Sequence, residues 1–267
     1  MLLGGLAACG SDSGTATDEP EVSSQEQGSE ADAADLPDEG ETVDNGDFVD
    51  WMMAGLDRST TAHMTMSMDY GGGGMDAEGQ VDYTTTPVSM SMTLGGEAMG
   101  TDELDMRLVD GVMYMNMGQM SNDKFFKFDL NDPDSLPPGM EGLGDQMDPL
   151  AAFKDFEPAL EEVVYVGSED VDGDDLDHFT ITMDTAKIPS LAEVPASAGL
   201  PDTVDYDMWF DEDFRVRQMN MAMDMGAQAG GTVDVQAKLF DWDEPVDIVA
   251  PDPDQVSDAP MGGAATG

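Results

Sequence analysis

Basic residues are scarce in this sequence. The chain of 267 residues has 9 Lys+Arg against 58 Asp+Glu, a formal net charge of −49. A surface of this charge repels a polyanion, which excludes nucleic-acid binding. The acidic surface keeps the protein solvated and would suit a salty medium, in which screening removes most of the self-repulsion. Capture of cations or of a basic partner is the functional alternative.

Cysteine and histidine are almost absent. Cys9 is the single cysteine, so an internal disulfide framework and a cysteine-based metal cluster are both excluded. The two histidines, His63 and His178, lie within alternating strand patterns, and no Gly-x-Ser-x-Gly motif provides a nucleophile. We therefore expect no enzymatic activity and no cofactor.

No apolar run approaches the roughly 20 residues of a membrane span. The start of the chain instead reads Leu6-Ala7-Ala8-Cys9 after MLLGG. This resembles a bacterial lipobox, in which the signal peptide is cut before a cysteine that is then acylated, for instance with palmitate. Residues 1–8 would be the remnant of that signal peptide, which is too short to be complete. The resemblance predicts a lipid anchor at the extracytoplasmic face of the cell membrane.

The segment after the cysteine is polar and acidic. Residues 10–46 carry no basic residue, and Val22, Leu36 and Val43 are their only larger apolar residues. Such a segment cannot bury enough apolar surface to offset its ordering entropy. We predict a lipidated, disordered tether over 9–46, a folded domain over 47–256 and a flexible tail over 257–267.

The folded part is predicted to begin with a helix capped by Asp47, with Phe48, Met52 and Leu56 on one face. Alternating apolar and polar residues then predict an antiparallel meander. Its strands are expected at 64–70, 81–83, 88–94, 104–108, 112–117 and 125–130, with a tight turn at Asp110-Gly111.

A second helical section is expected from Asp148, with Phe153 facing inward and Pro158 breaking the helix. Further strands are predicted at 163–168, 176–184, 204–210, 215–224 and 232–242. Each strand has one apolar and one wet face, which favours an α+β fold. One large curved antiparallel sheet would be covered on one side by the two helical sections.

Three stretches in this order carry a family resemblance: VVYVGSEDVDGDDLDHFTITMD, VDYDMWFDEDFRVRQMNM and the closing VQAKLFDWDEPVDIVAPDPDQV. Together with the lipobox, residues from about 48 to 256 resemble actinobacterial lipoproteins of the LppX/LprG type. The resemblance implies a half-barrel sheet like that of the LolA and LolB carriers, folded over helices. It also implies a hydrophobic cavity that holds the acyl chains of a lipid or glycolipid. We expect the protein to be a monomer.

Methionine is abundant, with 24 residues, and recurs at every second position of several strands. Its flexible thioether side chain repacks around an apolar guest more readily than a β-branched residue does. Phe153 and nine methionines are the candidates for the lipid cavity: Met64, Met66, Met68, Met90, Met92, Met106, Met219, Met221 and Met223. The simpler interpretation is that methionine fills a dry core.

These observations predict a membrane-anchored lipoprotein that binds an acyl-chain lipid for transport or transfer. Two alternatives stay open. One is a metal-binding lipoprotein that takes up Cu(I) through thioethers. Met113, Met115, Met117 and Met120 could bind the metal only if they lay exposed at a sheet edge. The other alternative is an interaction or sensor domain that has a filled core and no ligand.

Overall fold

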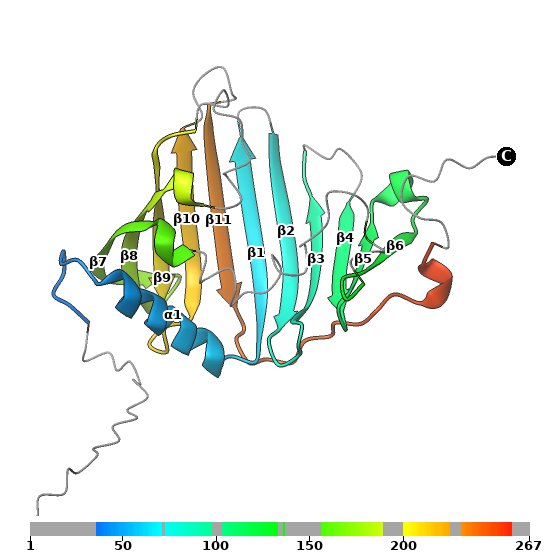
Figure 1. The fold of residues 1–267 in the computed structure, drawn as a ribbon, viewed down its shortest axis with the longest axis horizontal. Coiled ribbons are helices and arrows are strands. Elements are labelled where there is room, and N and C mark those ends of the chain that lie inside the picture. Colours follow the sequence, from blue (N-terminus) through cyan, green and yellow to red (C-terminus); the bar gives the residue numbers. More distant parts are fainter. Residues whose placement is uncertain are drawn as a thin grey trace, which may run out of the picture. The chain divides into compact units, whose positions relative to one another are not determined.

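The computed structural model describes residues 36–70, 73–97, 103–132, 136, 156–188, 200–224 and 231–257. The first element is helix α1 (Asn45–Arg58), and eleven strands follow it (Figure 1). The strands are β1 (Thr61–Tyr70), β2 (Gly73–Asp82), β3 (Ser89–Gly95), β4 (Leu104–Val109), β5 (Val112–Asn116), β6 (Phe125–Asp129), β7 (Leu160–Val171), β8 (Asp174–Asp184), β9 (Thr203–Phe210), β10 (Val216–Asp224) and β11 (Thr232–Phe240). Short 3₁₀ helices lie at η2 (Gly118–Ser121), η4 (Glu157–Ala159), η5 (Thr185–Lys187) and η8 (Pro253–Gln255).

All eleven strands belong to one antiparallel sheet in the order β6-β5-β4-β3-β2-β1-β11-β10-β9-β8-β7. The order describes two meanders, one from β1 to β6 and one from β7 to β11. They are joined where the first strand pairs with the last, so that Met66 lies opposite Ala237. The sheet is curved and does not close, because its two edge strands, β6 and β7, do not pair with each other. This confirms the α+β fold with a large curved antiparallel sheet.

Both edges of the sheet are partly covered by the chain itself. At β7, Gly40 N–H donates to the Tyr165 carbonyl at 2.7 Å and Val43 N–H donates to the Val163 carbonyl at 2.9 Å. At β6, Ser257 N–H donates to the Phe125 carbonyl at 2.8 Å. These segments occupy backbone groups that could otherwise pair with another chain. The contacts of residues 40–43 also move the start of the folded part ahead of residue 47, the boundary expected from composition.

The N-cap of helix α1 lies three residues before the predicted one. Asp44, rather than Asp47, is the N-cap, and its carboxylate accepts from Gly46 N–H at 2.9 Å. Asp47 instead lies in the first turn, where its negative charge interacts favourably with the positive end of the helix dipole. Phe48, Val49 and Met52 are buried, and the helix lies across strands β7 to β10 (Figure 1).

The apolar core is divided into two clusters. The larger one lies under α1, where Phe48, Phe179 and Phe210 pack with ring centroids 5.4 to 5.7 Å apart. The smaller one consists of Leu108, Met113 and Phe128 at the other end of the sheet. The second predicted helix falls largely outside the described residues, and its described end is the 3₁₀ helix η4.

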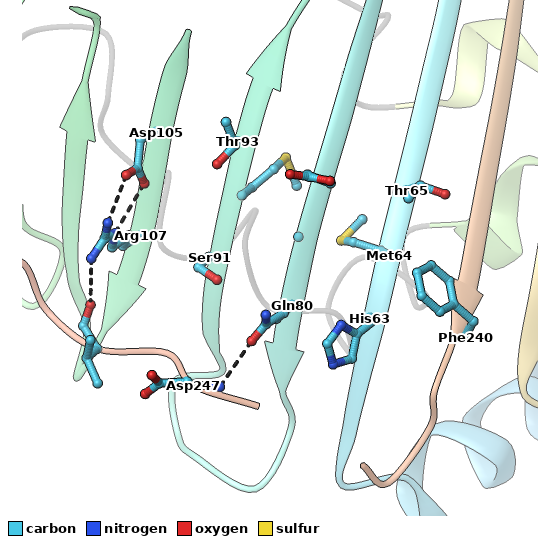
Figure 2. A pocket seen from close by; sticks show the side chains of 14 residues that line it. His63, Met64, Thr65, Gln80, Ser91, Thr93, Asp105, Arg107, Phe240 and Asp247 are labelled. Carbon is cyan, nitrogen blue, oxygen red and sulfur yellow. Dashed lines mark hydrogen bonds and ion pairs between the residues drawn. The ribbon is translucent and has the colours of Figure 1, made fainter. Parts of the chain in front are cut away.

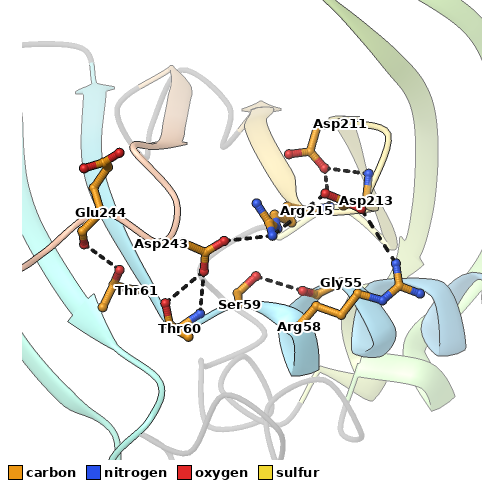
Figure 3. A network of polar contacts seen from close by, with 10 residues as sticks. All are labelled: Gly55, Arg58, Ser59, Thr60, Thr61, Asp211, Asp213, Arg215, Asp243 and Glu244. Carbon is orange, nitrogen blue, oxygen red and sulfur yellow. Dashed lines mark hydrogen bonds and ion pairs between the residues drawn. The ribbon is translucent and has the colours of Figure 1, made fainter.

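A polar network connects α1, β1 and the β9–β10 hairpin at the point where the two meanders meet (Figure 3). The Asp243 carboxylate accepts from Thr60 N–H at 2.8 Å and pairs with the Arg215 guanidinium at 2.8 Å. The backbone N–H of Arg215 in turn donates to the Asp211 carboxylate at 3.0 Å. Because its members lie far apart in sequence, the network anchors the closing segment of the chain to its beginning.

Candidate functional site: a methionine-lined face of the sheet

One face of the sheet is apolar from β4 to β7. Residues that are directly opposite in antiparallel strands point to the same side, as do residues two apart in one strand. The register therefore places nine residues in one continuous row across nine strands. In spatial order these are Leu104, Leu94, Ala77, Met66, Ala237, Met219, Met208, Phe179 and Tyr165.

A second row runs parallel to the first, two residues further along each strand. It consists of Met75, Met68, Val235, Met221, Tyr206, Ile181 and Val163. Because helix α1 packs on Phe179 and Phe210, both rows lie on the helix-covered side of the sheet. We call this surface the methionine face.

The methionines proposed from the alternation of the sequence come together on this face. They belong to β1, β3, β4 and β10, and their register partners are apolar residues, glycine or, opposite Met221, a tyrosine. The set is Met64, Met66, Met68, Met90, Met92, Met106, Met219, Met221 and Met223. The contributions of β2 and β11 were not recognisable in the sequence, because small residues such as Ala77, Gly79 and Ala237 give a weak alternating signal.

The face is not uniformly buried. Met223 is 9% exposed within the larger core, and Met90 and Met106 pack against the smaller core. Between the two cores, the central methionines belong to neither cluster of the described residues, and each is partly exposed. These are Met64, Met66, Met68, Met75 and Met92. The centre of the methionine face therefore has the composition of a core without the burial of one.

The opposite face of the same strands is polar. On β1, Thr65, Ser67 and Asp69 alternate with the methionines. On β2, Asp76 and Glu78 alternate with apolar residues and glycine. In the described part of the chain, grooves of about 500, 430 and 340 Å³ lie along this polar face. The sheet thus separates an apolar surface from a hydrophilic one over most of its width.

The two histidines both lie in strands, as expected. His178 contacts two carboxylates on the polar face, with Nδ1 2.9 Å from Glu169 and Nε2 2.9 Å from Asp207. Its ring stacks on Trp209 with centroids 4.3 Å apart. Hydrogen bonds from His178 and from Trp209 lower the pKa of Glu169. These contacts tie β7, β8 and β9 together and explain His178 as a structural residue.

The methionines considered for copper lie in dissimilar surroundings. Met113 is 1% exposed in the smaller core, whereas Met120 in η2 is 76% exposed. Met113 and Met115 belong to β5, which pairs on both sides, with β4 and with β6, so it is not an edge strand. The arrangement required for three exposed sulfurs is therefore not met. Among the described residues, no three His, Cys, Asp or Glu side chains are grouped to hold a metal ion.

Two predicted site residues, Cys9 and Phe153, lie outside the described residues. The lipid anchor at Cys9 thus stays a prediction from the sequence. Among the helices that the structure describes, none has the length and apolarity needed to cross a membrane.

Comparison with known proteins gives similarity at the level of structure. No family model and no curated protein sequence matches the chain. The solved structure of lipoprotein LppX from Mycobacterium tuberculosis is similar at 12% identity and a TM-score of 0.49, covering 77% of this chain and 100% of LppX. LprF from Mycobacterium bovis gives 12% identity and a TM-score of 0.48, covering 77% of this chain and 97% of LprF. MucB in its Pseudomonas aeruginosa complex with MucA gives 14% and 0.38, covering 80% of this chain and 61% of the other.

Proposed function

We propose that this protein is an extracytoplasmic lipoprotein, anchored through acylated Cys9, that binds an acyl-chain lipid on the methionine face for transport or transfer. One observation carries the proposal. The five central methionines form an apolar surface between two cores, yet they remain partly exposed among the described residues. Contiguous apolar side chains that stay partly exposed are typical of a binding surface, which supports the proposal.

The chemistry of the face suits an acyl chain. Each CH₂ group that is transferred from water to an apolar surface contributes about 0.8 kcal/mol, so a chain of ordinary length supplies ample affinity without polar contacts. The thioethers of Met66 and Met68 adapt to the positions of successive methylene groups, because each side chain has three rotatable bonds. Selectivity among chains would be low.

The proposed role requires neither catalysis nor a cofactor. Lipid binding on a face of a rigid sheet allows the protein to shield the apolar part of an amphiphile while the opposite, acidic face stays in water. The ligand would be a lipid or glycolipid, and the membrane would be contacted through the anchor.

Native mass spectrometry tests the proposal. The mature chain with Cys9→Ser is exported by a cleavable signal peptide, so that it meets membrane lipid but carries no covalent lipid. We expect a reproducible extra mass that organic extraction releases as a lipid. A bare chain mass that persists after incubation with a lipid extract would contradict the proposal and favour a domain without a ligand.

A further inference from the structure

A groove on the polar face lies on the far side of the sheet from the methionine face. Its volume is about 500 Å³, and its floor is formed by adjacent strands β1 to β4 (Figure 2). Its polar lining includes His63, Thr65, Gln80, Ser91 and Thr93, with Phe240 at one end. A volume of this size is in the range of small-molecule sites.

One wall of the groove is the extended segment that follows β11. This segment passes below the lower ends of β1 to β5 on its way to β6 (Figure 1). Asp247 N–H donates to the Gln80 side-chain carbonyl at 3.1 Å, and the Arg107 guanidinium donates to the Val249 carbonyl at 3.4 Å. Residues distant in sequence thus build the groove, and side chains of its floor hold its wall in place.

Several polar side chains of the groove are available to a ligand. Within the described part of the chain, the hydroxyls of Thr65, Ser91 and Thr93 and the carboxylate of Glu78 make no side-chain hydrogen bond or ion pair. Each hydroxyl can donate once and accept twice, and the carboxylate only accepts. The four groups come from three neighbouring strands, so they offer donors and acceptors to a single ligand along the floor.

The charges of the groove select the class of ligand. Its guanidinium, Arg107, is already occupied by Asp105, with contacts of 2.9 and 3.2 Å. Glu78 and Asp247 leave the groove acidic, which disfavours phosphates, carboxylates and other anions. Ligand hydroxyl groups, in contrast, can donate to the carboxylate of Glu78 and exchange hydrogen bonds with the serine and threonine hydroxyls.

An aromatic surface completes the site. Phe240 lies beside His63, with ring centroids 5.9 Å apart, at the end of the groove opposite Arg107 (Figure 2). A pyranose ring has an apolar face that can lie against such rings while its hydroxyls point to the strand side chains. We propose that this groove binds a neutral oligosaccharide, independently of lipid binding on the other face.

The test uses the full mature chain with Cys9→Ser and three uncharged probes: mannotriose, maltotriose and N,N′,N″-triacetylchitotriose. Isothermal titration calorimetry and amide chemical shifts measure their binding. We expect saturable binding of at least one trisaccharide, with shifts confined to β1 to β4 and the segment around Asp247. The double variant Ser91→Ala/Thr93→Val should weaken that binding about tenfold, because it removes two hydroxyls from the floor.

The matched control is Thr232→Val, which removes an exposed hydroxyl of β11 outside the groove and should change affinity less than about twofold. Urea unfolding of all variants verifies that they are folded. The proposal is overturned if none of the three probes binds at about 10 mM, or if the double variant binds as well as the parent. Binding of pentalysine to the groove in place of the sugars, abolished by salt, would also overturn it and identify a cationic peptide site.

Discussion

Gly55 of α1 lies directly against the backbone carbonyl of Phe214, so that a Cβ at position 55 would be 2.1 Å from that oxygen. Because the obstacle is backbone, the helix itself would have to move away from the β9–β10 hairpin. We predict that Gly55→Ala lowers the free energy of unfolding by about 2–3 kcal/mol, although alanine is the better helix former.

Urea unfolding followed by circular dichroism measures this change. The control is Asp57→Ala in the same helix, where the side chain is exposed and a change within about 0.5 kcal/mol is expected. Equal stability of the parent and Gly55→Ala would show that α1 can shift without cost.

A polar substitution should separate the two faces of β1. Gln has nearly the length of Met but carries an amide that is costly to place against an acyl chain. We predict that Met66→Gln lowers the affinity for the co-purified lipid about tenfold. Ser67→Gln, one residue along and on the polar face, should change it less than about twofold. Lipid occupancy is read by native mass spectrometry, and similar losses in both variants would contradict lipid binding on the methionine face.

Asp243 should make the free energy of unfolding depend on pH in the acid range. The pKa of Asp243 is lowered, chiefly by the hydrogen bond from Thr60 N–H. The Thr60 hydroxyl and the Arg215 guanidinium lower it further. A carboxylate with a lowered folded-state pKa stabilises the protein above its unfolded pKa of about 3.9, and that contribution is lost as the pH falls through the folded value.

We therefore predict that Asp243→Asn lowers the free energy of unfolding by about 1 kcal/mol at neutral pH and by less in strong acid. This value takes the partial exposure of the side chain into account. Asparagine tolerates the left-handed backbone at this position, where φ is 64°. Urea unfolding between pH 7 and pH 2 tests this, and a cost that does not depend on pH would contradict it.

Alkaline pH should destabilise the protein through buried tyrosines. Burial raises the pKa of Tyr83, which stacks on Trp242, to about 12. The pKa of tyrosine in the unfolded chain is about 10. The contribution of Tyr83 to the free energy of unfolding is therefore fully present below pH 10 and is lost as the pH rises toward 12. Burial and the hydrogen bond to Asp177 likewise raise the pKa of Tyr165 to about 12.

Tyr83→Phe keeps the ring stacked on Trp242 and removes the ionisable group. We expect its free energy of unfolding to fall less steeply between pH 10 and pH 12 than that of the parent, with phenolate absorbance recording the ionisation. Identical slopes in the parent and the variant would show that Tyr83 ionises without unfolding the protein.

Salt should stabilise the folded chain. With a net charge of −49, repulsion among carboxylates opposes the compact state, and raising KCl from about 0.1 M to about 1 M shortens the screening length from roughly 10 to 3 Å. We expect the thermal midpoint to rise over this range. A falling midpoint would mean that pairs such as Asp172–Lys238, at 2.7 Å, outweigh the repulsion.

The local features of the fold could be predicted from the sequence because their causes are local. Alternation with a period of two determines that Met64, Met66 and Met68 share a face, whichever strand lies beside them. The Asp110-Gly111 turn was recognisable because Asp and Gly tolerate the positive φ that a tight hairpin requires. In the structure their φ values are 53° and 75°. The N-cap of α1 was displaced by three residues because Asp44 and Asp47 are both suitable caps, and only the structure shows which carboxylate accepts the hydrogen bonds.

Sequence alone thus determined the alternation, the turns and the acidity of this protein, each of which depends on neighbouring residues or on composition. The tertiary structure decided that β1 pairs with β11, which unites the apolar sides of two meanders into one face. It also decided that Met113 lies in a core while Met66 stays partly exposed, and that the segment at Asp247 turns a flat polar face into a groove. These outcomes depend on contacts between residues far apart in the chain, which a periodic pattern within one strand does not specify.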